Sequence, residues 1–112
     1  MRQGKVFYKD EFAGIITETN EGEYLFEYDK EYINQFSNQP ITFSMPVLDK
    51  VYKDNRLFPF FEGLIPEGWL LEIASKSWKI NQNDRMGLLL ACCKNCVGAV
   101  SVIPITTNED YE

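Results

Sequence analysis

Short runs of aromatic and β-branched residues, partly alternating with polar ones, dominate the first third of the chain. Three such runs predict β-strands at residues 5–9, 15–19 and 23–28. The polar segment 19–22, Thr-Asn-Glu-Gly, supplies turn residues, so the second and third strands should form a hairpin. A helical turn is expected within residues 29–36.

Proline and glycine interrupt this pattern in the middle of the chain. Residues 40–45 predict a further short strand, which the following proline should end. Residues 56–69 hold seven large apolar side chains, two prolines and two glycines, and no regular period fits them. Such a segment predicts a bent backbone whose apolar side chains are buried in a core or at an interface. We expect at least two of Phe58, Phe60 and Phe61 in the core.

Helical periodicity is confined to the last third. Residues 69–80 separate into an apolar arc and a polar arc on a helical wheel, as an amphipathic helix does. Residues 81–84 should end this helix and cap a second, nearly all apolar one at 85–93. A last strand is predicted at 99–103, and Pro104 should stop it.

Together these elements predict one α+β domain, a small curved antiparallel β-sheet packed with two main helices. At 112 residues, with 45% hydrophobic and 14% aromatic content, the chain is long and apolar enough to bury one core. The domain should cover residues 1–105, followed by a polar C-terminal tail at 106–112.

The net charge of the chain argues against direct binding to some classes of partner. Eleven Lys and Arg against 17 Asp and Glu give a net charge of −6, so direct nucleic-acid binding would need a local basic patch. The nearest candidates, Lys50, Lys53 and Arg56 and then Lys76 and Lys79, are interleaved with acidic or apolar residues. We therefore expect no direct nucleic-acid binding and no adhesion to an anionic membrane. A basic protein partner fits the charge better.

Membrane insertion and secretion are not expected either. No apolar run approaches the roughly 20 residues that a spanning helix needs. The N-terminal residues show neither a long apolar stretch nor a small-residue cleavage site. The expected location is cytoplasmic.

The chain lacks the residue types that most catalytic sites use. It contains no histidine, the commonest general base and metal ligand, and no phosphate-binding glycine motif or nucleophile elbow. Glu62 and Glu67 could form an acid–base pair, but a helix-start charge and a loop hydrogen bond explain them more simply. We predict a protein that is not an enzyme and that uses no cofactor or metal.

Three cysteines, Cys92, Cys93 and Cys96, lie within five residues of each other. An odd number in a cytoplasmic setting argues against a disulfide framework, and zinc would lack a fourth ligand. We favour small apolar packing residues. A thioredoxin-like redox pair of Cys93 and Cys96 is the alternative, although it would follow a helix rather than precede one.

The segment 57–69, Leu-Phe-Pro-Phe-Phe-Glu-Gly-Leu-Ile-Pro-Glu-Gly-Trp, is more specific than composition alone would give. It resembles the first N-terminal subdomain of the HipA family, and the resemblance covers most of residues 5–103. Further segments that carry it are Asp84-x-x-x-Leu88-Leu89, Cys96-Val-Gly-Ala-Val100, Ala13-Gly14 and the Tyr24-Phe26-Tyr28 strand.

The resemblance implies a place in bacterial toxin–antitoxin modules. HipA-like proteins are Ser/Thr kinases that act as toxins, and in full-length members a much larger kinase body follows this subdomain. Free-standing versions, called HipS, occur in three-component modules. There HipS binds the kinase toxin HipT and holds it inactive, while the helix-turn-helix protein HipB binds the operator. The polar ending at 106–112 favours such a separate gene product over an excised domain.

The implied function is that of an antitoxin that neutralises a HipT-like kinase by direct contact, with a HipB-like protein in a larger complex. In the family, the Trp of the Pro-Glu-Gly-Trp motif reaches toward the kinase active site, and that residue is Trp69 here. The expected partner-binding residues are Trp69, Glu67, Gly68, Pro66, Glu62 and Phe60. One alternative is that Trp69 only seals the core against residues 58–61. Another is that the domain is a non-inhibitory structural part of a HipA-like kinase or of its DNA-bound assembly.

Overall fold

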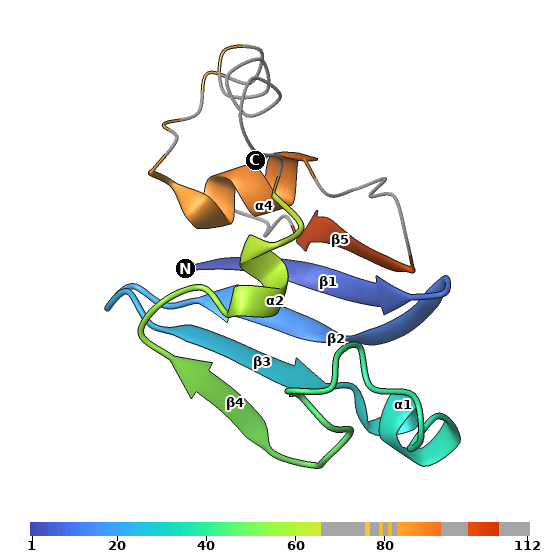
Figure 1. The fold of residues 1–112 in the computed structure, drawn as a ribbon. Helices are drawn as coiled ribbons and strands as arrows, with labels where there is room; N and C mark the ends of the chain where they lie inside the picture. The colour runs from blue at the N-terminus through green and yellow to red at the C-terminus, as the bar shows by residue number, and fades with distance from the viewer. Residues whose placement is uncertain (66–75, 77–78, 80, 82, 93–98, 106–112) are drawn as a thin grey trace.

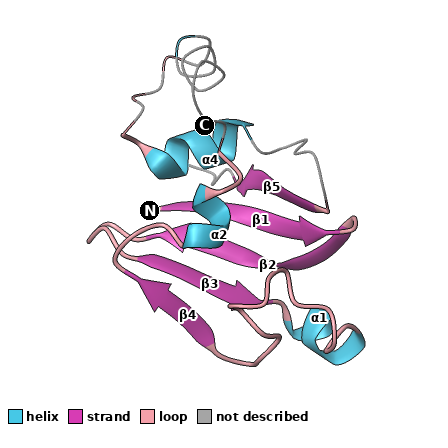
Figure 2. Cartoon of the chain, viewed as in Figure 1, coloured by secondary structure: helices cyan, strands magenta, loops and turns pink. Residues whose placement is uncertain are grey.

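Five antiparallel strands form an open sheet in the computed structural model, in the order β4-β3-β2-β1-β5 (Figure 1). The structure describes residues 1–65, 76, 79, 81, 83–92 and 99–105. The strands are β1 (Arg2–Tyr8), β2 (Glu11–Glu18), β3 (Tyr24–Tyr28), β4 (Val51–Asp54) and β5 (Val100–Ile105). The helices in this described part are α1 (Lys30–Gln35), α2 (Pro59–Glu62) and α4 (Arg85–Cys92) (Figure 2). The predicted α+β class is confirmed.

Two tight turns connect the first three strands. Lys9 and Asp10, between β1 and β2, have φ values of 51° and 69°, the left-handed conformation that a two-residue hairpin turn requires. Between β2 and β3, the Thr19 hydroxyl accepts a hydrogen bond from the Glu23 backbone N–H at 3.1 Å, and Gly22 has a φ of 86°. The predicted hairpin of the second and third strands is confirmed.

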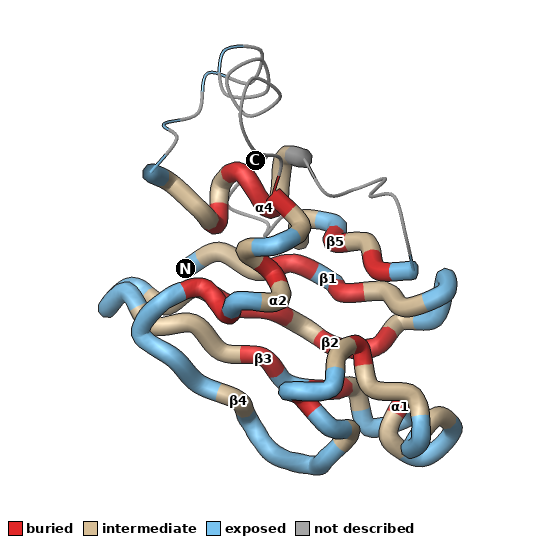
Figure 3. The backbone as a smooth tube through the Cα atoms, viewed as in Figure 1, coloured by how far each residue is buried: buried red, intermediate tan, exposed pale blue. Residues whose placement is uncertain are grey.

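Buried and more exposed residues alternate along strands of the sheet, so that one of its faces is buried (Figure 3). Strand residues alternate between faces, and directly paired residues share a face. Gly4 pairs with Ile16, and Ile16 pairs with Phe26; the side chains of Ile16 and Phe26 have no exposed surface. On the opposite face, exposed Lys5 pairs with half-buried Ile15. This contrast fixes the register, because a slip by one residue would carry the core side chains into solvent.

Helices α2 and α4 cover the buried face. Phe61 of α2 packs against Phe26 of β3 with ring centroids 5.7 Å apart. A Cβ atom at Gly4 would lie 2.8 Å from Leu90 Cδ2, so glycine at this point of β1 lets α4 approach the sheet closely. The residues of α4 with no exposed surface are Met86, Leu88 and Leu89.

The helical turn expected after the third strand is α1. The Asp29 carboxylate caps it by accepting a hydrogen bond from the Glu31 backbone N–H at 3.1 Å. Tyr32, on the inner side of α1, is 2% exposed and stacks on Tyr28 of β3 with ring centroids 5.8 Å apart. The short helix thus closes one end of the core.

Residues 40–45 do not form the predicted strand, and that prediction was wrong. The segment contains only an isolated bridge between Thr42 and Met45. The hydroxyl of Tyr28 accepts the Ile41 backbone N–H at 3.0 Å and donates to the Met45 carbonyl. Hydrogen bonds to a side chain therefore take the place of a strand ladder. The fourth strand in sequence is instead β4, which the pattern of apolar residues did not indicate.

Pro104 does not stop the last strand, which is a second correction. It lies inside β5, opposite Gly4 of β1. Because β5 is an edge strand, one side of its backbone has no partner strand, and a proline without an N–H is tolerated there. Helix α4 begins at Arg85 as predicted. Most of the helix predicted at 69–80 and the tail at 106–112 lie outside the described residues.

Candidate partner-binding site

The short helix α2 lies within the aromatic-rich segment that carried the partner prediction. Pro59 occupies its first turn, where the missing N–H of proline costs no hydrogen bond. Phe58 and Phe61 are 7% and 0% exposed, so the prediction of at least two core phenylalanines is confirmed. Phe60 is half-buried and meets Phe61 edge-on, with ring centroids 5.2 Å apart. Part of the Phe60 ring therefore remains at the surface beside a rigid core.

An ion pair between Glu62 and Arg85 joins α2 to the start of α4. The Arg85 Nε donates to both carboxylate oxygens of Glu62, at 3.2 and 3.1 Å, and Nη2 donates to Oε1 at 2.9 Å. The two side chains are 37% and 31% exposed, so the pair lies at the edge of the core. The contact gives Glu62 a structural partner, and the acid–base pairing with Glu67 is not tested because Glu67 lies outside the described residues.

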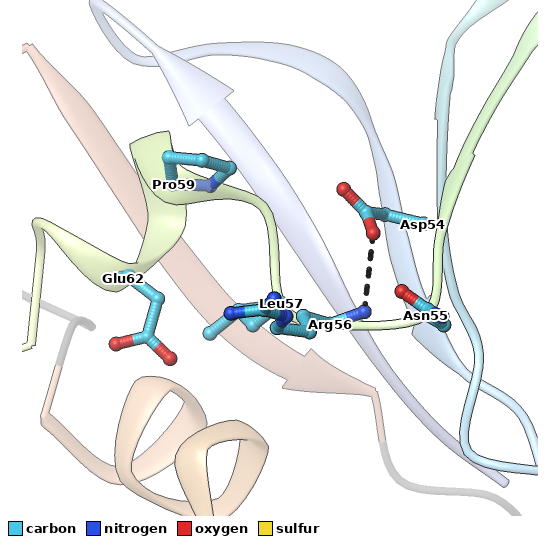
Figure 4. Close-up of a pocket in the computed structure, with 6 residues that line it drawn as sticks. All are labelled: Asp54, Asn55, Arg56, Leu57, Pro59 and Glu62. Atoms are coloured by element: carbon cyan, nitrogen blue, oxygen red, sulfur yellow. Dashed lines mark hydrogen bonds between the residues drawn. The ribbon is translucent and has the colours of Figure 1, made fainter.

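A depression of 510 Å³ opens beside α2 (Figure 4). The residues that line it are Asp54, Asn55, Arg56, Leu57, Pro59 and Glu62. The Arg56 backbone N–H donates to the Asp54 carboxylate at 3.3 Å, which shapes the turn between β4 and α2. Residues of both charges line this depression, and the exposed Arg56 side chain borders it. Such a surface suits a polar segment of another protein better than an apolar small molecule.

Arg2 contacts the start of α4 through Asp84. Its guanidinium donates to the Asp84 carboxylate at 3.0 and 2.8 Å and to Glu18 at 2.7 Å. Asp84 also accepts the Gly87 backbone N–H at 3.1 Å, which is an N-cap contact for α4. The hydrogen bonds from Arg2, more than any other contact, lower the pKa of the Asp84 carboxyl. The sequence predicted the cap at 81–84 but gave no sign of its ion pair with Arg2.

The structure describes two of the six predicted partner-binding residues. Phe60 and Glu62 lie on α2, while Pro66, Glu67, Gly68 and Trp69 lie outside the described residues. The described chain reaches Ile65, which is 2% exposed and so belongs to the core. The partner-binding role of all six residues stays a prediction. The roles of Cys92, Cys93 and Cys96 also stay open, because Cys93 and Cys96 are not described.

The described part of the chain contains neither a cluster of metal ligands nor a membrane-spanning helix. No group of three or more His, Cys, Asp or Glu side chains gathers there in a way that could hold a metal ion. None of the described helices is long and apolar enough to cross a membrane.

Comparison with known proteins identifies the family to which a chain of this fold belongs. The model of the HipA N-terminal domain matches residues 4–103. The chain belongs to the HipA N-terminal domain family. Membership confirms the resemblance drawn from residues 57–69 and associates the chain with toxin–antitoxin systems.

Two similar proteins illustrate the match. An uncharacterized protein of Haemophilus influenzae is 33% identical over 102 residues, which cover 91% of this chain and 92% of that protein. A solved structure of the N-terminal domain of HipA toxin is 29% identical, with a TM-score of 0.73, and the match covers 96% of this chain and 95% of that one. This chain therefore covers nearly the whole length of both relatives.

Proposed function

We propose that this HipA N-terminal domain protein is an antitoxin-type protein that binds and neutralises a separate HipA-like Ser/Thr kinase toxin of the HipT type. The observation that carries the proposal is the fixed position of α2. Phe61 holds it to the sheet and Arg85 ties it to α4, while Phe60 and Glu62 keep part of their surface exposed. Because α2 is held in place on both sides, its contact residues lose little conformational entropy when a partner binds.

The contact surface proposed for the kinase combines α2 with the residues that follow it in sequence. Its members are Phe60, Glu62, Pro66, Glu67, Gly68 and Trp69. Tryptophan is enriched among residues that dominate binding energy, because it buries a large area with few torsions. Glu62 and Glu67 would lie at the rim. Because Arg85 already pairs with Glu62, Glu67 and the net charge of −6 are what favour a basic cleft on the kinase. Inhibition then follows from steric or conformational blockade of that cleft.

The match over nearly the whole Haemophilus influenzae protein supports a separate inhibitor, because this chain covers 92% of that relative. We propose that the protein acts in the cytoplasm, without direct contact to nucleic acid or membrane. A HipB-like helix-turn-helix protein would supply operator binding in a larger complex.

A structural role is the second candidate. The solved N-terminal domain of HipA toxin has the same fold, so the domain also exists as a part of a toxin. In this case the chain would complete a HipA-like kinase, or join subunits of its DNA-bound assembly, without inhibiting catalysis.

Co-expression with the HipA-like kinase encoded next to this chain tests both roles. Growth rescue of the host and co-purification of the two proteins are the expected results. Trp69→Ala should abolish rescue while the variant stays folded. Phe12→Ala is the matched control, because Phe12 lies on the face of the sheet opposite α2. The Lys5 Nζ lies over its ring, 5.9 Å from the ring centroid. A stable complex without rescue would favour the structural role, and the absence of any complex would overturn the proposal.

A further inference from the structure

The loop formed by residues 39–46 displays an aromatic side chain at its tip. Phe43 is 98% exposed, whereas Ile41 and Met45 on either side of it are 5% and 3% exposed. The Met45 backbone N–H donates to the Thr42 carbonyl at 3.1 Å, which closes the turn beneath Phe43. The loop is therefore fixed in the core on both flanks, and its largest side chain points away from the core.

Three tyrosine hydroxyls hold this loop in place. Tyr28 accepts the Ile41 N–H at 3.0 Å and also donates to the Met45 carbonyl. The Tyr32 hydroxyl donates to the Gln39 carbonyl at 2.7 Å, and the Tyr52 hydroxyl donates to the Pro46 carbonyl at 2.6 Å. A single exposed apolar side chain is ordinary on a protein surface. A phenylalanine on a turn fixed from three separate elements is different, because it is pre-organised for contact.

The loop and α2 lie on the same side of the sheet. Tyr28, which holds the loop, contacts Phe26 with ring centroids 4.9 Å apart, and Phe26 contacts Phe61 of α2 at 5.7 Å. These rings lie on the buried face of the sheet, and Figure 1 shows the loop before β4 and α2 in front of that same face. A single partner that covers α2 can therefore reach the loop without passing around the sheet.

Charge indicates which kind of partner would cover Phe43. The loop at 39–46 carries no charged side chain, and Lys9 is the charged residue that lines the same depression as Phe43. The chain as a whole carries a net charge of −6. That charge opposes association with a second copy and favours a protein with a basic surface.

We propose that Phe43 is a second contact point for the kinase partner and inserts into an apolar socket on that protein, apart from the contact made by α2 and residues 66–69. The inference rests on the proposed function, because it names a further part of the same interface. The socket would be bordered by neutral residues, because exposed Lys9 lines the depression beside Phe43. The fixed loop would place the ring in it without loss of backbone freedom.

Binding affinity between the purified full chain and its kinase partner tests the inference. Phe43→Ala should weaken binding about tenfold or more, as the loss of a central aromatic contact does. Its melting temperature should stay unchanged, because the side chain makes little contact in the free protein. Phe43→Leu, which keeps an apolar side chain, should restore most of the affinity. Phe12→Ala, on the opposite face, should bind as the wild type does.

The outcomes separate the two proposals. If the wild type binds the kinase and Phe43→Ala binds equally well, the inference about Phe43 is overturned and the proposed function stands. If the wild type does not bind, both fall. Sedimentation of the free chain tests whether the protein associates with itself. Self-association that depends on Phe43 would show that a second copy occupies this surface, and it would overturn the inference.

Discussion

Arg2 and Asp84, 82 positions apart in the chain, are joined by two parallel hydrogen bonds of 3.0 and 2.8 Å. The contact links the first strand to the first turn of α4, and Asp84 caps that helix with the same carboxylate. Glu18 accepts from the Arg2 Nε at 2.7 Å, so one guanidinium joins β1, β2 and α4. Helix α4 in turn holds α2 through Arg85. The position of the candidate site thus depends on a charge network at the N-terminus.

Acid should weaken this link. The pKa of Asp84 is lowered by its hydrogen bonds to Arg2 and by the Gly87 N–H, against an opposing effect of burial. A carboxyl group whose pKa is lower in the folded state contributes stability above its unfolded pKa of about 3.9. That contribution is lost as the pH falls through the folded value. Asp84→Asn keeps a capping oxygen but removes the charge, and should lower the free energy of unfolding at pH 7 by about 1 kcal/mol.

Urea unfolding at pH 7 and at pH 3 measures the effect. The difference between wild type and Asp84→Asn should shrink at pH 3, because that pH lies below the unfolded pKa of about 3.9, where the stability contributed by the lowered pKa of Asp84 is being lost. Asp49→Asn is the control, since Asp49 forms an exposed pair with Lys30 and should show no such change. An equal difference at both pH values would mean that the ion pair with Arg2 does not stabilise the fold.

Gly14 should not tolerate any side chain. A Cβ atom at this position would lie 2.3 Å from the Glu27 carbonyl oxygen and 3.0 Å from the Phe26 ring. These atoms belong to the paired strand β3, so they cannot move aside without breaking the ladder. Gly14→Ala should lower the free energy of unfolding by about 2–3 kcal/mol, measured by urea denaturation.

Gly63→Ala is the matched control for Gly14→Ala. Gly63 follows α2 with a φ of −67°, and a Cβ there would meet no atom closer than 3.5 Å. Its stability should stay within about 0.5 kcal/mol of the wild type. If both alanine variants lose stability equally, close packing between β2 and β3 is not the cause.

The three N-terminal strands and α4 could be predicted because local pattern and tertiary structure agree there. In β3 the buried residues Phe26 and Tyr28 alternate with exposed Glu27, as they do in a strand with one buried face. The turn at 19–22 also has the composition that its geometry needs. Helix α4 follows a capping carboxylate, Asp84, and is apolar along most of its length.

The errors arose where tertiary contacts decide the local structure. Residues 40–45 have the composition of a strand, but the Tyr28 hydroxyl takes up their backbone groups. Prolines at both ends of that segment were a signal against a central strand. Strand β4 was missed because its four residues include charged Lys53 and Asp54, which an edge strand accommodates. Pro104 is accepted inside β5 for the same reason.

The candidate site was predictable only in part. Phe60 and Glu62 stand out in sequence because residues 57–69 form an unusual apolar string. Phe43 does not stand out, because an apolar residue within a predicted strand is expected to face the core. Only the fixed turn, which depends on distant tyrosines, shows that its side chain is exposed.

The neighbouring residues Phe60 and Phe61 should respond differently to truncation. Phe61 has no exposed surface and contacts Phe26, Phe58 and Phe60, so Phe61→Ala should cost about 3–5 kcal/mol. Phe60 is half-buried, and Phe60→Ala should cost about 1–2 kcal/mol. Thermal unfolding followed by circular dichroism gives both values. A folded Phe60→Ala variant that loses kinase binding would assign Phe60 to the interface, whereas unchanged binding would remove it from the site.

Tyr28→Phe should destabilise the loop at 39–46 without changing the shape of the core. The hydroxyl accepts the Ile41 N–H and donates to the Met45 carbonyl, so its removal leaves two buried backbone groups without these hydrogen bonds. We expect a loss of about 2–3 kcal/mol at pH 7. Tyr52→Phe is the control, because its hydroxyl bonds the Pro46 carbonyl at an exposed position, where water can replace it.

Unfolding at alkaline pH measures the contribution of the same Tyr28 hydroxyl to stability. Burial raises the pKa of Tyr28 to about 12, whereas an unfolded tyrosine titrates near pH 10. A group with a raised folded pKa contributes its full stability below the unfolded value and loses it as the pH rises through the folded one. The wild type should therefore lose stability between about pH 10 and 12, and Tyr28→Phe should lose less over that interval. Parallel curves for the two proteins would show that burial does not raise the pKa of Tyr28 in the folded protein.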